Sequence, residues 1–372
     1  MICRDVERFF IYHSPQYPGF TSWCGLWAMP DDGVMCSFTQ ATGPFVGRPR
    51  APEDVRRRLS WPPAGHVDGY DMTGLHMENV NLWSGDRGRS WQVKSTDAFT
   101  SCMNGAAGQA ETCLPDGRVL RGVWGRYLPY DDTPDDGFVQ ASSTASVSWG
   151  PPLLINTDPA CAFFPKRLHL LADGSLLVGG GHFRRDPERD ARDEWNRSLT
   201  PALYRSVDGG VSWAGPVPVV SPDWLPRFGF TEEFDWVELA DGDLLVVLRA
   251  APEDGRLQTV LRRDGDTWRT AEVTCTAMPH SGHPELLALT QGAVLHLATT
   301  GISCSTDGGG TWSDVSLGDG LAELRGEPAT PYYPKSLRLV SGEVLVVGHV
   351  GGDNAYGAVD QSIVGLRFRV EL

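Results

Sequence analysis

The sequence predicts an all-β protein built as a six-bladed β-propeller. Three observations support this: one hairpin pattern occurs six times, a second turn motif recurs between the hairpins, and the composition leaves little room for long helices. Of 372 residues, 43 are glycine and 27 are proline, and 41% are hydrophobic, which is typical of a globular chain with a large core and many turns.

Each hairpin consists of a short apolar strand, a tight turn that is usually Asp-Gly, and a second apolar strand. Asp-Gly between two apolar runs is a strong signal for a hairpin turn. Because the apolar character is almost continuous, we expect both faces of these strands to be covered, as in the inner strands of propeller blades. The six turn glycines are Gly33, Gly117, Gly174, Gly242, Gly292 and Gly342.

A second motif, S-x-D-x-G-x-[S/T]-W, falls between the hairpins. Complete copies span residues 84–91, 206–213 and 305–312, and worn copies span 142–149 and 263–268. In such a turn the aspartate accepts hydrogen bonds from nearby backbone N–H groups, glycine supplies a positive φ, and tryptophan packs between neighbouring sheets. The motif therefore indicates a repeated blade.

The alternation of these turns, known as Asp boxes or BNR repeats, with Asp-Gly hairpins resembles the sialidase (neuraminidase) superfamily across essentially the whole chain. The resemblance implies one domain, residues 1–372, of four-stranded blades, with the Asp boxes on the face opposite the active site. No Asp box follows the sixth hairpin, and residues 5–13 form a strand without a blade. We expect this N-terminal strand to complete the last blade and close the ring, which removes exposed sheet edges.

Charge and cysteine content exclude several classes of partner. The formal net charge is -15, whereas nucleic acids and anionic membranes require a basic surface. The eight cysteines show neither a C-x-x-C pair nor metal-ligand spacing, so we expect mostly buried free thiols. The N-terminal segment lacks the apolar stretch of a signal peptide, which predicts a cytoplasmic protein unless a leader precedes it. We expect no cofactor, and the oligomeric state stays open.

Hairpin geometry identifies candidate pocket residues. If the Asp-Gly turns lie on one face, the start of each first strand and the end of each second strand lie on the other. Lys166 and Lys335 stand in matching F-F-P-K and Y-Y-P-K settings three blades apart, so they should face each other across the axis. Glu285 takes the matching place in blade five, and His182 and His349 end second strands. This pocket would suit a polar or anionic sugar; surface salt bridges are the alternative explanation.

The resemblance implies catalytic roles for further residues. Sialidases carry a glutamate nine residues before one turn glycine and an arginine seven residues after it, which correspond to Glu233 and Arg249. Their tyrosine, nine residues before a later turn glycine, corresponds to Tyr333. In the family the tyrosine attacks the anomeric carbon, an exception among glycosidases, and the glutamate accepts its proton because a phenol is otherwise a poor nucleophile. A core tyrosine and an exposed glutamate are the structural alternative.

The family's acid/base is an aspartate in the loop after the second strand of blade one. That loop spans residues 40–76 here, and loops of such length in compact domains are usually functional. Asp71 is the preferred candidate and Asp68 the runner-up, although Asp68 precedes a glycine and a simple turn would explain it.

The chain departs from the family at its arginines. Family members grip a carboxylate with three arginines, because the planar guanidinium binds it bidentately. Only Arg249 is in register here, and Lys166, Arg167 and Lys335 would form a substitute ring of cations. The acidic run 130–137 and the pair His280 and His283 lack complete metal-ligand spacing, so we expect no metal.

Three functions are compatible with these residues. The first is a sialidase-like glycoside hydrolase of exo-α-sialidase type, acting on a terminal sugar, acidic sugars included. The second is a polysaccharide lyase or other uronate-acting enzyme, in which Lys, His or Tyr removes a proton α to a carboxylate. The third is a non-catalytic glycan-binding propeller, since a fold does not imply a function. Hydrolysis releases a reducing sugar, elimination an unsaturated uronate, and binding neither.

Overall fold

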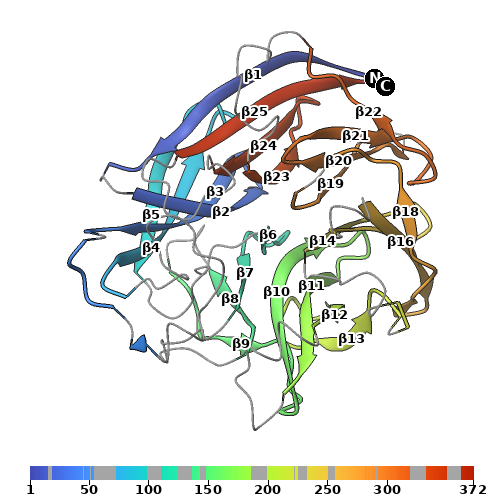
Figure 1. Ribbon diagram of the computed structural model, residues 1–372, viewed down its shortest axis with the longest axis horizontal. Helices are drawn as coiled ribbons and strands as arrows, with labels where there is room; N and C mark the ends of the chain where they lie inside the picture. Colours follow the sequence, from blue (N-terminus) through green and yellow to red (C-terminus); the bar gives the residue numbers. More distant parts are fainter. Residues whose placement is uncertain are drawn as a thin grey trace.

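The computed structural model describes residues 1–15, 19–44, 46–50, 52–53, 73–98, 110–124, 136–142, 148–185, 199–221, 223–224, 233–249, 256–280, 282–289, 292–318, 332–349 and 362–372. All 25 elements in these ranges are β-strands, arranged as six sheets around a central axis (Figure 1). The predicted six-bladed propeller is confirmed. Within the same ranges, no helix is long and apolar enough to cross a membrane.

The first three blades are four-stranded antiparallel sheets whose strands follow chain order from the axis outward. Blade one contains β2 (Gly19–Ala28), β3 (Val34–Thr42), β4 (His76–Ser84) and β5 (Gln92–Ala98). Blade two contains β6 (Glu111–Cys113), β7 (Val119–Val123), β8 (Phe138–Ser142) and β9 (Leu153–Leu154). Blade three contains β10 (Cys161–Leu170), β11 (Leu176–Arg184), β12 (Thr200–Ser206) and β13 (Ala214–Pro218).

Blades four and five repeat this order. Blade four contains β14 (Phe234–Glu238), β15 (Leu244–Arg249), β16 (Arg256–Asp264) and β17 (Thr267–Arg269), and β18 (Thr274–Thr276) also pairs with β16. Blade five contains β19 (Glu285–Ala288), β20 (Val294–Ala298), β21 (Gly301–Ser305) and β22 (Ser313–Asp314).

Blade six joins the two ends of the chain. It contains β23 (Tyr332–Arg338), β24 (Val344–His349), β25 (Ser362–Glu371) and, at its outer edge, β1 (Ile2–His13). β1 pairs antiparallel with β25 from Ile2 opposite Glu371 to His13 opposite Ser362, and the two termini lie side by side in Figure 1. The predicted ring closure is confirmed. The strand begins at Ile2 rather than at residue 5, because pairing continues beyond a register shift between Arg4 and Glu7.

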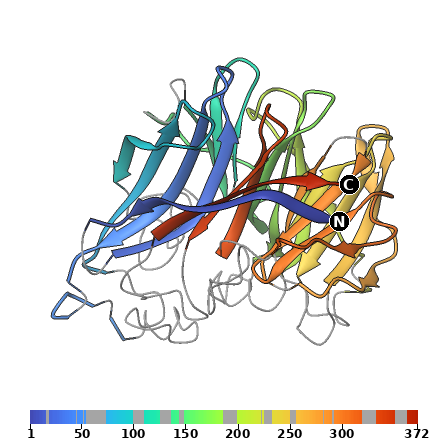
Figure 2. The ribbon, with the colours of Figure 1, turned by 90° about the horizontal axis from the view of Figure 1, so that it is seen from above.

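The hairpin turns gather on one face of the ring, along the upper edge of Figure 2. In five blades the left-handed turn residue is the predicted glycine, with φ between 79° and 85°. Blade one differs: Asp32 takes this conformation at φ 62°, and Gly33 follows it. Aspartate tolerates positive φ better than most residues, and the Asp31 carboxylate accepts the Gly33 N–H at 3.1 Å, which stabilises the turn.

The three complete S-x-D-x-G-x-[S/T]-W turns share one hydrogen-bond pattern. In the second copy, Ser206 Oγ donates to Asp208 Oδ1 at 2.8 Å, and the same oxygen accepts the N–H groups of Val211 and Ser212 at 3.0 and 2.9 Å. The first copy repeats all three contacts, and the third repeats the serine contact and the second backbone contact. Hydrogen bonds from Ser212 lower the pKa of Asp208 to about 2, so the carboxylate stays an acceptor at neutral pH.

Apolar layers between neighbouring blades form the core. In one layer, Leu177 and Leu203 of blade three pack in a single cluster with Phe234, Trp236 and Leu244 of blade four. Because each sheet is covered on both faces, its inner strands are almost continuously apolar, as the sequence pattern indicated.

Charged side chains meet in the middle of the ring. In four blades they come from the inner strand, from the position seven residues before the left-handed turn residue. Arg167, Asp235, Glu285 and Lys335 occupy this position in blades three to six, all nearly fully buried, and we call them the axial belt. Glu285 Oε2 lies 3.0 Å from Arg167 Nη2 and 3.4 Å from Lys335 Nζ. Arg167 Nε lies 3.6 Å from Asp235 Oδ1. In blade order the belt therefore reads cation, anion, anion, cation, and each carboxylate lies within 3.6 Å of a cation from another blade.

The belt carboxylates also join neighbouring blades. Asp235 of blade four accepts the N–H of Leu286 in blade five at 2.8 Å. Glu285 of blade five accepts the N–H of Ser336 in blade six at 2.7 Å. Each carboxylate thus satisfies a backbone donor of the next inner strand and links the two blades.

Replacing Arg167 by Met should destabilise the whole ring. The change leaves Asp235 and Glu285 without the cation they share, and breaking a buried pair costs about 3–5 kcal/mol of unfolding free energy. Urea denaturation followed by circular dichroism measures this loss. Arg4→Met is the matched control: it breaks an exposed ion pair with Glu371, and should cost less than about 1 kcal/mol. Equal losses in the two variants would contradict the role given to the belt.

Candidate active site

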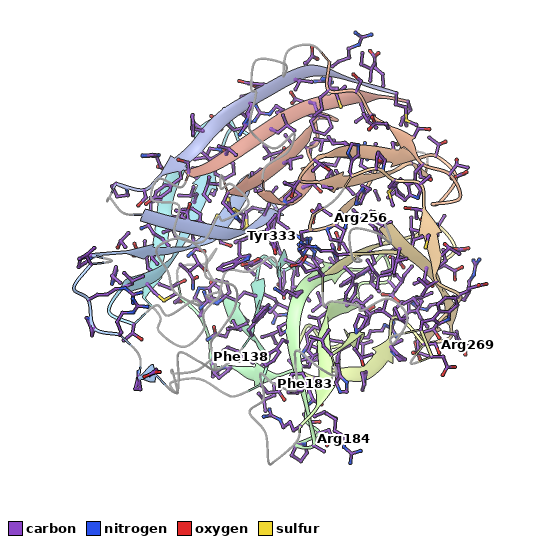
Figure 3. The ribbon with its side chains drawn as sticks, in the orientation of Figure 1. Phe138, Phe183, Arg184, Arg256, Arg269 and Tyr333 are labelled. Carbon is purple, nitrogen blue, oxygen red and sulfur yellow. The ribbon has the colours of Figure 1, made fainter. Side chains whose placement is uncertain are left out.

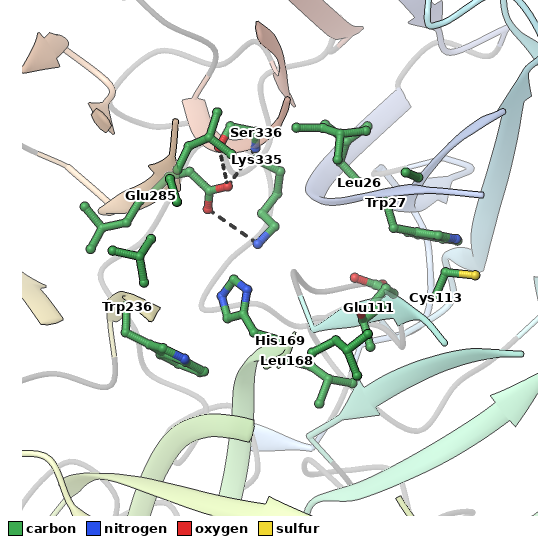
Figure 4. A pocket seen from close by; sticks show the side chains of 18 of the residues that line it. Leu26, Trp27, Glu111, Cys113, Leu168, His169, Trp236, Glu285, Lys335 and Ser336 are labelled. Carbon is green, nitrogen blue, oxygen red and sulfur yellow. Dashed lines mark hydrogen bonds and ion pairs between the residues drawn. The ribbon is translucent and has the colours of Figure 1, made fainter. Parts of the chain in front are cut away.

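The axial belt separates two ends of the central axis. On the turn side, a cavity of about 460 Å³ is lined by inner-strand residues of all six blades (Figure 4). Glu111, Glu285 and Lys335 bring charge to this cavity, whereas Leu168 and Trp236 make its wall apolar. In Figure 4 the Lys335 side chain points into the cavity with its ion pair to Glu285 drawn beside it.

The opposite end of the axis holds the residues that the resemblance singled out. The Tyr333 hydroxyl donates to Glu233 Oε1 at 2.7 Å, and Arg249 Nη1 donates to Glu233 Oε2 at 2.5 Å. Glu233 immediately precedes β14, Arg249 ends β15, and Tyr333 lies on β23. Residues 100 positions apart in the chain therefore meet at the mouth of the ring, and Figure 3 shows Tyr333 near its centre.

A β-bulge directs the Tyr333 side chain toward the axis. The register between β23 and β24 shifts between Tyr332 and Lys335, so β23 carries one extra residue there. Tyr333 itself has φ 50°, a left-handed conformation that is strained for an aromatic residue. Strain of this kind persists only where surrounding contacts hold it, and functional sites are where it gathers. The bulge lets Tyr333 reach across blade five to Glu233 in blade four.

Two cations keep Glu233 ionised. Burial acts to raise the pKa of this carboxyl, but the charges of Arg249 and then Lys166 outweigh burial and hold the pKa below its ordinary value. The Tyr333 hydroxyl strengthens the effect, because its hydrogen bond favours the carboxylate form. At neutral pH Glu233 is therefore an anion poised to accept the phenolic proton.

Two neutral imidazoles flank the Tyr333 ring. Its centroid lies 5.0 Å from that of His283 and 5.9 Å from that of His349, the latter nearly parallel at 20°. Burial lowers the pKa of His349 to about 3. Burial and then the charge of Arg167 hold the pKa of His283 well below its ordinary value. Neither ring adds charge beside the phenol at neutral pH.

The predicted ring of cations is divided between the mouth and the belt. Lys166 is buried, with Nζ 3.7 Å from the centre of the Trp124 ring, and its charge acts on Glu233. Arg167, Lys335 and Glu285 instead form ion pairs within the axial belt. The two lysines do not stand in equivalent positions: Lys166 lies eight residues before Gly174, inside the bulge of β10, whereas Lys335 lies seven residues before Gly342, beyond the corresponding bulge of β23.

His182 lies away from Tyr333. His182 lies eight residues after its turn glycine, whereas His349 lies seven residues after its own. Because successive strand residues point to opposite faces, the two histidines face opposite sides of their strands. The His182 ring instead faces Tyr204 of β12, with centroids 6.4 Å apart. Asp71 and Asp68, the acid/base candidates, lie outside the described residues.

Two mouth residues were not recognised as such from the sequence. Arg256 lies directly opposite Arg249 in the β15–β16 ladder, is 2% exposed, and donates through Nε to the His280 carbonyl at 3.0 Å. His283 was considered only as a metal ligand. Counting back from Gly292 could have identified it, because it lies nine residues before that turn glycine, as Glu233 and Tyr333 do before theirs.

Metal binding finds no support in the described part of the chain, where no group of three or more His, Cys, Asp or Glu side chains could hold an ion. The two histidines of the M-P-H-S-G-H segment turn to different partners. His280 Nε2 lies 2.6 Å from Asp314 Oδ1, and His283 Nδ1 lies 2.9 Å from Arg167 Nη2. Residues 130–135 of the acidic run lie outside the described ranges.

Solved structures share the architecture of this chain. A protein of unknown function from Dyadobacter fermentans is 18% identical, with 99% of each chain covered and a TM-score of 0.65. The GH93 α-L-arabinofuranosidase of Fusarium graminearum, solved with arabinobiose, is 13% identical, with 99% of this chain and 98% of that chain covered and a TM-score of 0.59. The intramolecular trans-sialidase of Ruminococcus gnavus, solved with oseltamivir carboxylate, is 12% identical, with 94% of each chain covered and a TM-score of 0.56.

At these identities the similarity is one of fold, the six-bladed β-propeller. No protein-family model matches the chain, and no curated protein matches its sequence.

Removing Arg249 should raise the pKa of Glu233. In Arg249→Met the leading charge that opposes burial is lost, so the carboxyl protonates at a higher pH than in the unaltered protein. Because the native pKa is depressed, the stability that ionised Glu233 contributes is present above its unfolded pKa and is lost as pH falls through its folded pKa. Arg249→Met should therefore lose this stabilisation at a higher pH than the unaltered protein does.

The titration of Glu233 is measured by NMR of ¹³C-carboxyl-labelled glutamate, assigned with Glu233→Gln. Arg269→Met serves as the control, because Arg269 pairs with exposed Asp264 and lies at the rim of Figure 3. An unchanged or lower midpoint in Arg249→Met would contradict the electrostatic account of this site.

Proposed function

We propose that this protein is a retaining glycoside hydrolase in which Tyr333 is the nucleophile and Glu233 its base. The observation that carries the proposal is the 2.7 Å hydrogen bond from the Tyr333 hydroxyl to the ionised, buried Glu233. A phenol becomes a competent nucleophile only when its proton has an acceptor within hydrogen-bond reach. The pair supplies that acceptor at the mouth of the axis.

In the proposed reaction the Tyr333 oxygen attacks the anomeric carbon while Glu233 takes the phenolic proton. An acid, for which Asp71 is our candidate, protonates the leaving oxygen as the glycosidic bond breaks. Water, deprotonated by the same aspartate, then displaces Tyr333 from the glycosyl-enzyme, and Glu233 returns the proton to the phenolate. Two displacements retain the configuration of the anomeric carbon.

The charges at the mouth favour an anionic sugar. Arg249 and Arg256 face each other in one ladder, and like charges placed so are unfavourable without a compensating anion. Burial, followed by the charge of Arg249, lowers the pKa of Arg256 to about 10, so it is still a cation at neutral pH. Its Nη2 is buried and has no hydrogen-bond partner within the described ranges. Glu233 compensates part of this positive charge, and a substrate carboxylate would provide both the partner and a further negative charge.

A neutral glycoside is the second candidate substrate. It is favoured by the similarity in fold to the Fusarium graminearum arabinofuranosidase solved with arabinobiose. The lyase hypothesis loses much of its support, because Lys335 is paired with Glu285 in the belt and His182 lies away from Tyr333. A non-catalytic glycan-binding propeller would not require the Tyr333–Glu233 contact.

Tyr333→Phe should abolish hydrolysis without loss of the fold, because it removes the attacking oxygen and nothing else. The assay is fluorescence release from a panel of 4-methylumbelliferyl glycosides that includes sialic acid, uronic acid and arabinofuranose derivatives. Tyr204→Phe, the same change in blade three, is the control and should keep its activity. Turnover that survives in Tyr333→Phe would exclude the nucleophile assignment.

Arg256→Met should discriminate between the two substrate classes. It removes one cation, so binding of oseltamivir carboxylate should weaken about tenfold while binding of neutral arabinobiose stays unchanged. Isothermal titration calorimetry measures both. Arg256→Lys, which keeps the charge, tests the folding of the site, and Arg184→Met at the rim of Figure 3 is the surface control. Equal losses for both ligands would count against an anionic substrate.

A further inference from the structure

His283 is fixed in one tautomer by the axial belt. The residue is 1% exposed and precedes β19 by one proline. Its Nδ1 lies 2.9 Å from Arg167 Nη2, and a guanidinium can only donate, so Nδ1 must be the acceptor. A neutral imidazole with an accepting Nδ1 carries its hydrogen on Nε2. Arg167 donates from the same nitrogen to the Pro284 carbonyl at 2.8 Å, which anchors the loop that holds His283.

Among the residues that the structure describes, the Nε2–H donor of His283 has no partner: it is buried and makes no hydrogen bond to any of them. The two nitrogens of an imidazole point away from each other, so Nε2 faces away from the Arg167 guanidinium. The Tyr333 ring lies beside the imidazole, with centroids 5.0 Å apart and planes tilted by 39°. An unsatisfied buried donor is unfavourable and rare in folded proteins, and one at a functional site points to a group that is supplied from outside.

We infer that His283 is a substrate-binding residue whose Nε2–H donates a hydrogen bond to an oxygen of the sugar held against Tyr333. The inference rests on the proposed function and extends it, because it assigns the contact to blade five, between the base in blade four and the nucleophile in blade six. The ligand it requires is a sugar with an acceptor oxygen next to the reacting carbon, whether hydroxyl, ring or carboxylate oxygen.

A neutral donor suits this place better than a further cation. Burial, and then the charges of Arg167, Lys166, Arg249 and Lys335, lower the pKa of the imidazole and keep it uncharged. A neutral N–H group orients an oxygen without adding to the positive charge around Glu233. The carboxylate therefore stays ionised, and its pKa is not lowered further. The donor is also rigid, since one nitrogen of the ring is fixed by Arg167.

Two substitutions separate the donor from the ring. His283→Phe keeps a flat ring against Tyr333 but removes the donor, and His283→Gln keeps an amide that can accept from Arg167 and donate to a ligand. The probes are oseltamivir carboxylate and arabinobiose, titrated by calorimetry. For whichever probe binds the unaltered protein, we expect His283→Phe to weaken binding about tenfold and His283→Gln to restore most of it. His182→Phe, the same change in blade three, should leave binding unchanged.

A spectrum of the unaltered protein tests the inference independently of any variant. Long-range ¹H–¹⁵N correlation of protein labelled in its nine histidines reports the tautomer of each ring, with His283 assigned through His283→Gln. We expect the Nε2–H tautomer for His283 in the free protein. Addition of a bound probe should shift its Nε2–H resonance as the donor gains an acceptor.

The outcomes separate this inference from the proposed function. Native affinity in folded His283→Phe, an Nδ1–H tautomer, or a resonance that does not move when a probe binds would overturn the role of His283 and leave the hydrolase proposal intact. Binding with a shifted resonance but no turnover of any glycoside would support the contact and count against hydrolysis. If neither probe binds the unaltered protein, the inference fails.

Discussion

The buried ion pairs at the axis are the constraint on which the rest of the structure depends. Six inner strands converge there, and the side chains that meet must either be small or satisfy one another. Arg167, Asp235 and Glu285 come from three different blades, so each is compensated only when those blades stand in their correct order. Burying these charges is costly, and the cost is offset only by closed geometry. The axial belt therefore specifies the order of the blades in the ring as well as stabilising the ring.

The belt also governs the chemistry at the mouth. Arg167 fixes the tautomer of His283, and His283 lies beside Tyr333. Burial and the surrounding cations set the charge of two neighbouring groups: the cations outweigh burial and keep the Glu233 carboxyl ionised, whereas burial and the cations together keep the His283 imidazole neutral. One electrostatic environment thus holds a carboxylate beside a neutral imidazole, even though the chain as a whole carries a formal charge of -15.

Function on this fold depends on the few residues that occupy the mouth. Structures that share the propeller at 12–18% identity carry descriptions as different as an arabinofuranosidase, a trans-sialidase and a protein of unknown function. The blades supply equivalent positions around the axis, and this chain carries a different side chain at each of them. The same register that holds Tyr333 and Glu233 in two blades holds His283 in the blade between them.

Much of this architecture was determined by the sequence alone. Six Asp-Gly-like hairpins and three complete turn motifs specify six blades, because hairpin and turn chemistry are local, and the spacing of Glu233, Arg249 and Tyr333 from their turn glycines predicted residues that the structure brings together. Local signals could not show which cations meet which anions. The place of Lys166 inside a bulge, the left-handed Asp32 and the pairing of Arg256 with Arg249 depend on the register within a blade, and the contact of Arg167 with His283 depends on how two blades meet. Register and contacts between blades are set only when the strands pair and the blades pack together, so the tertiary structure alone decided them.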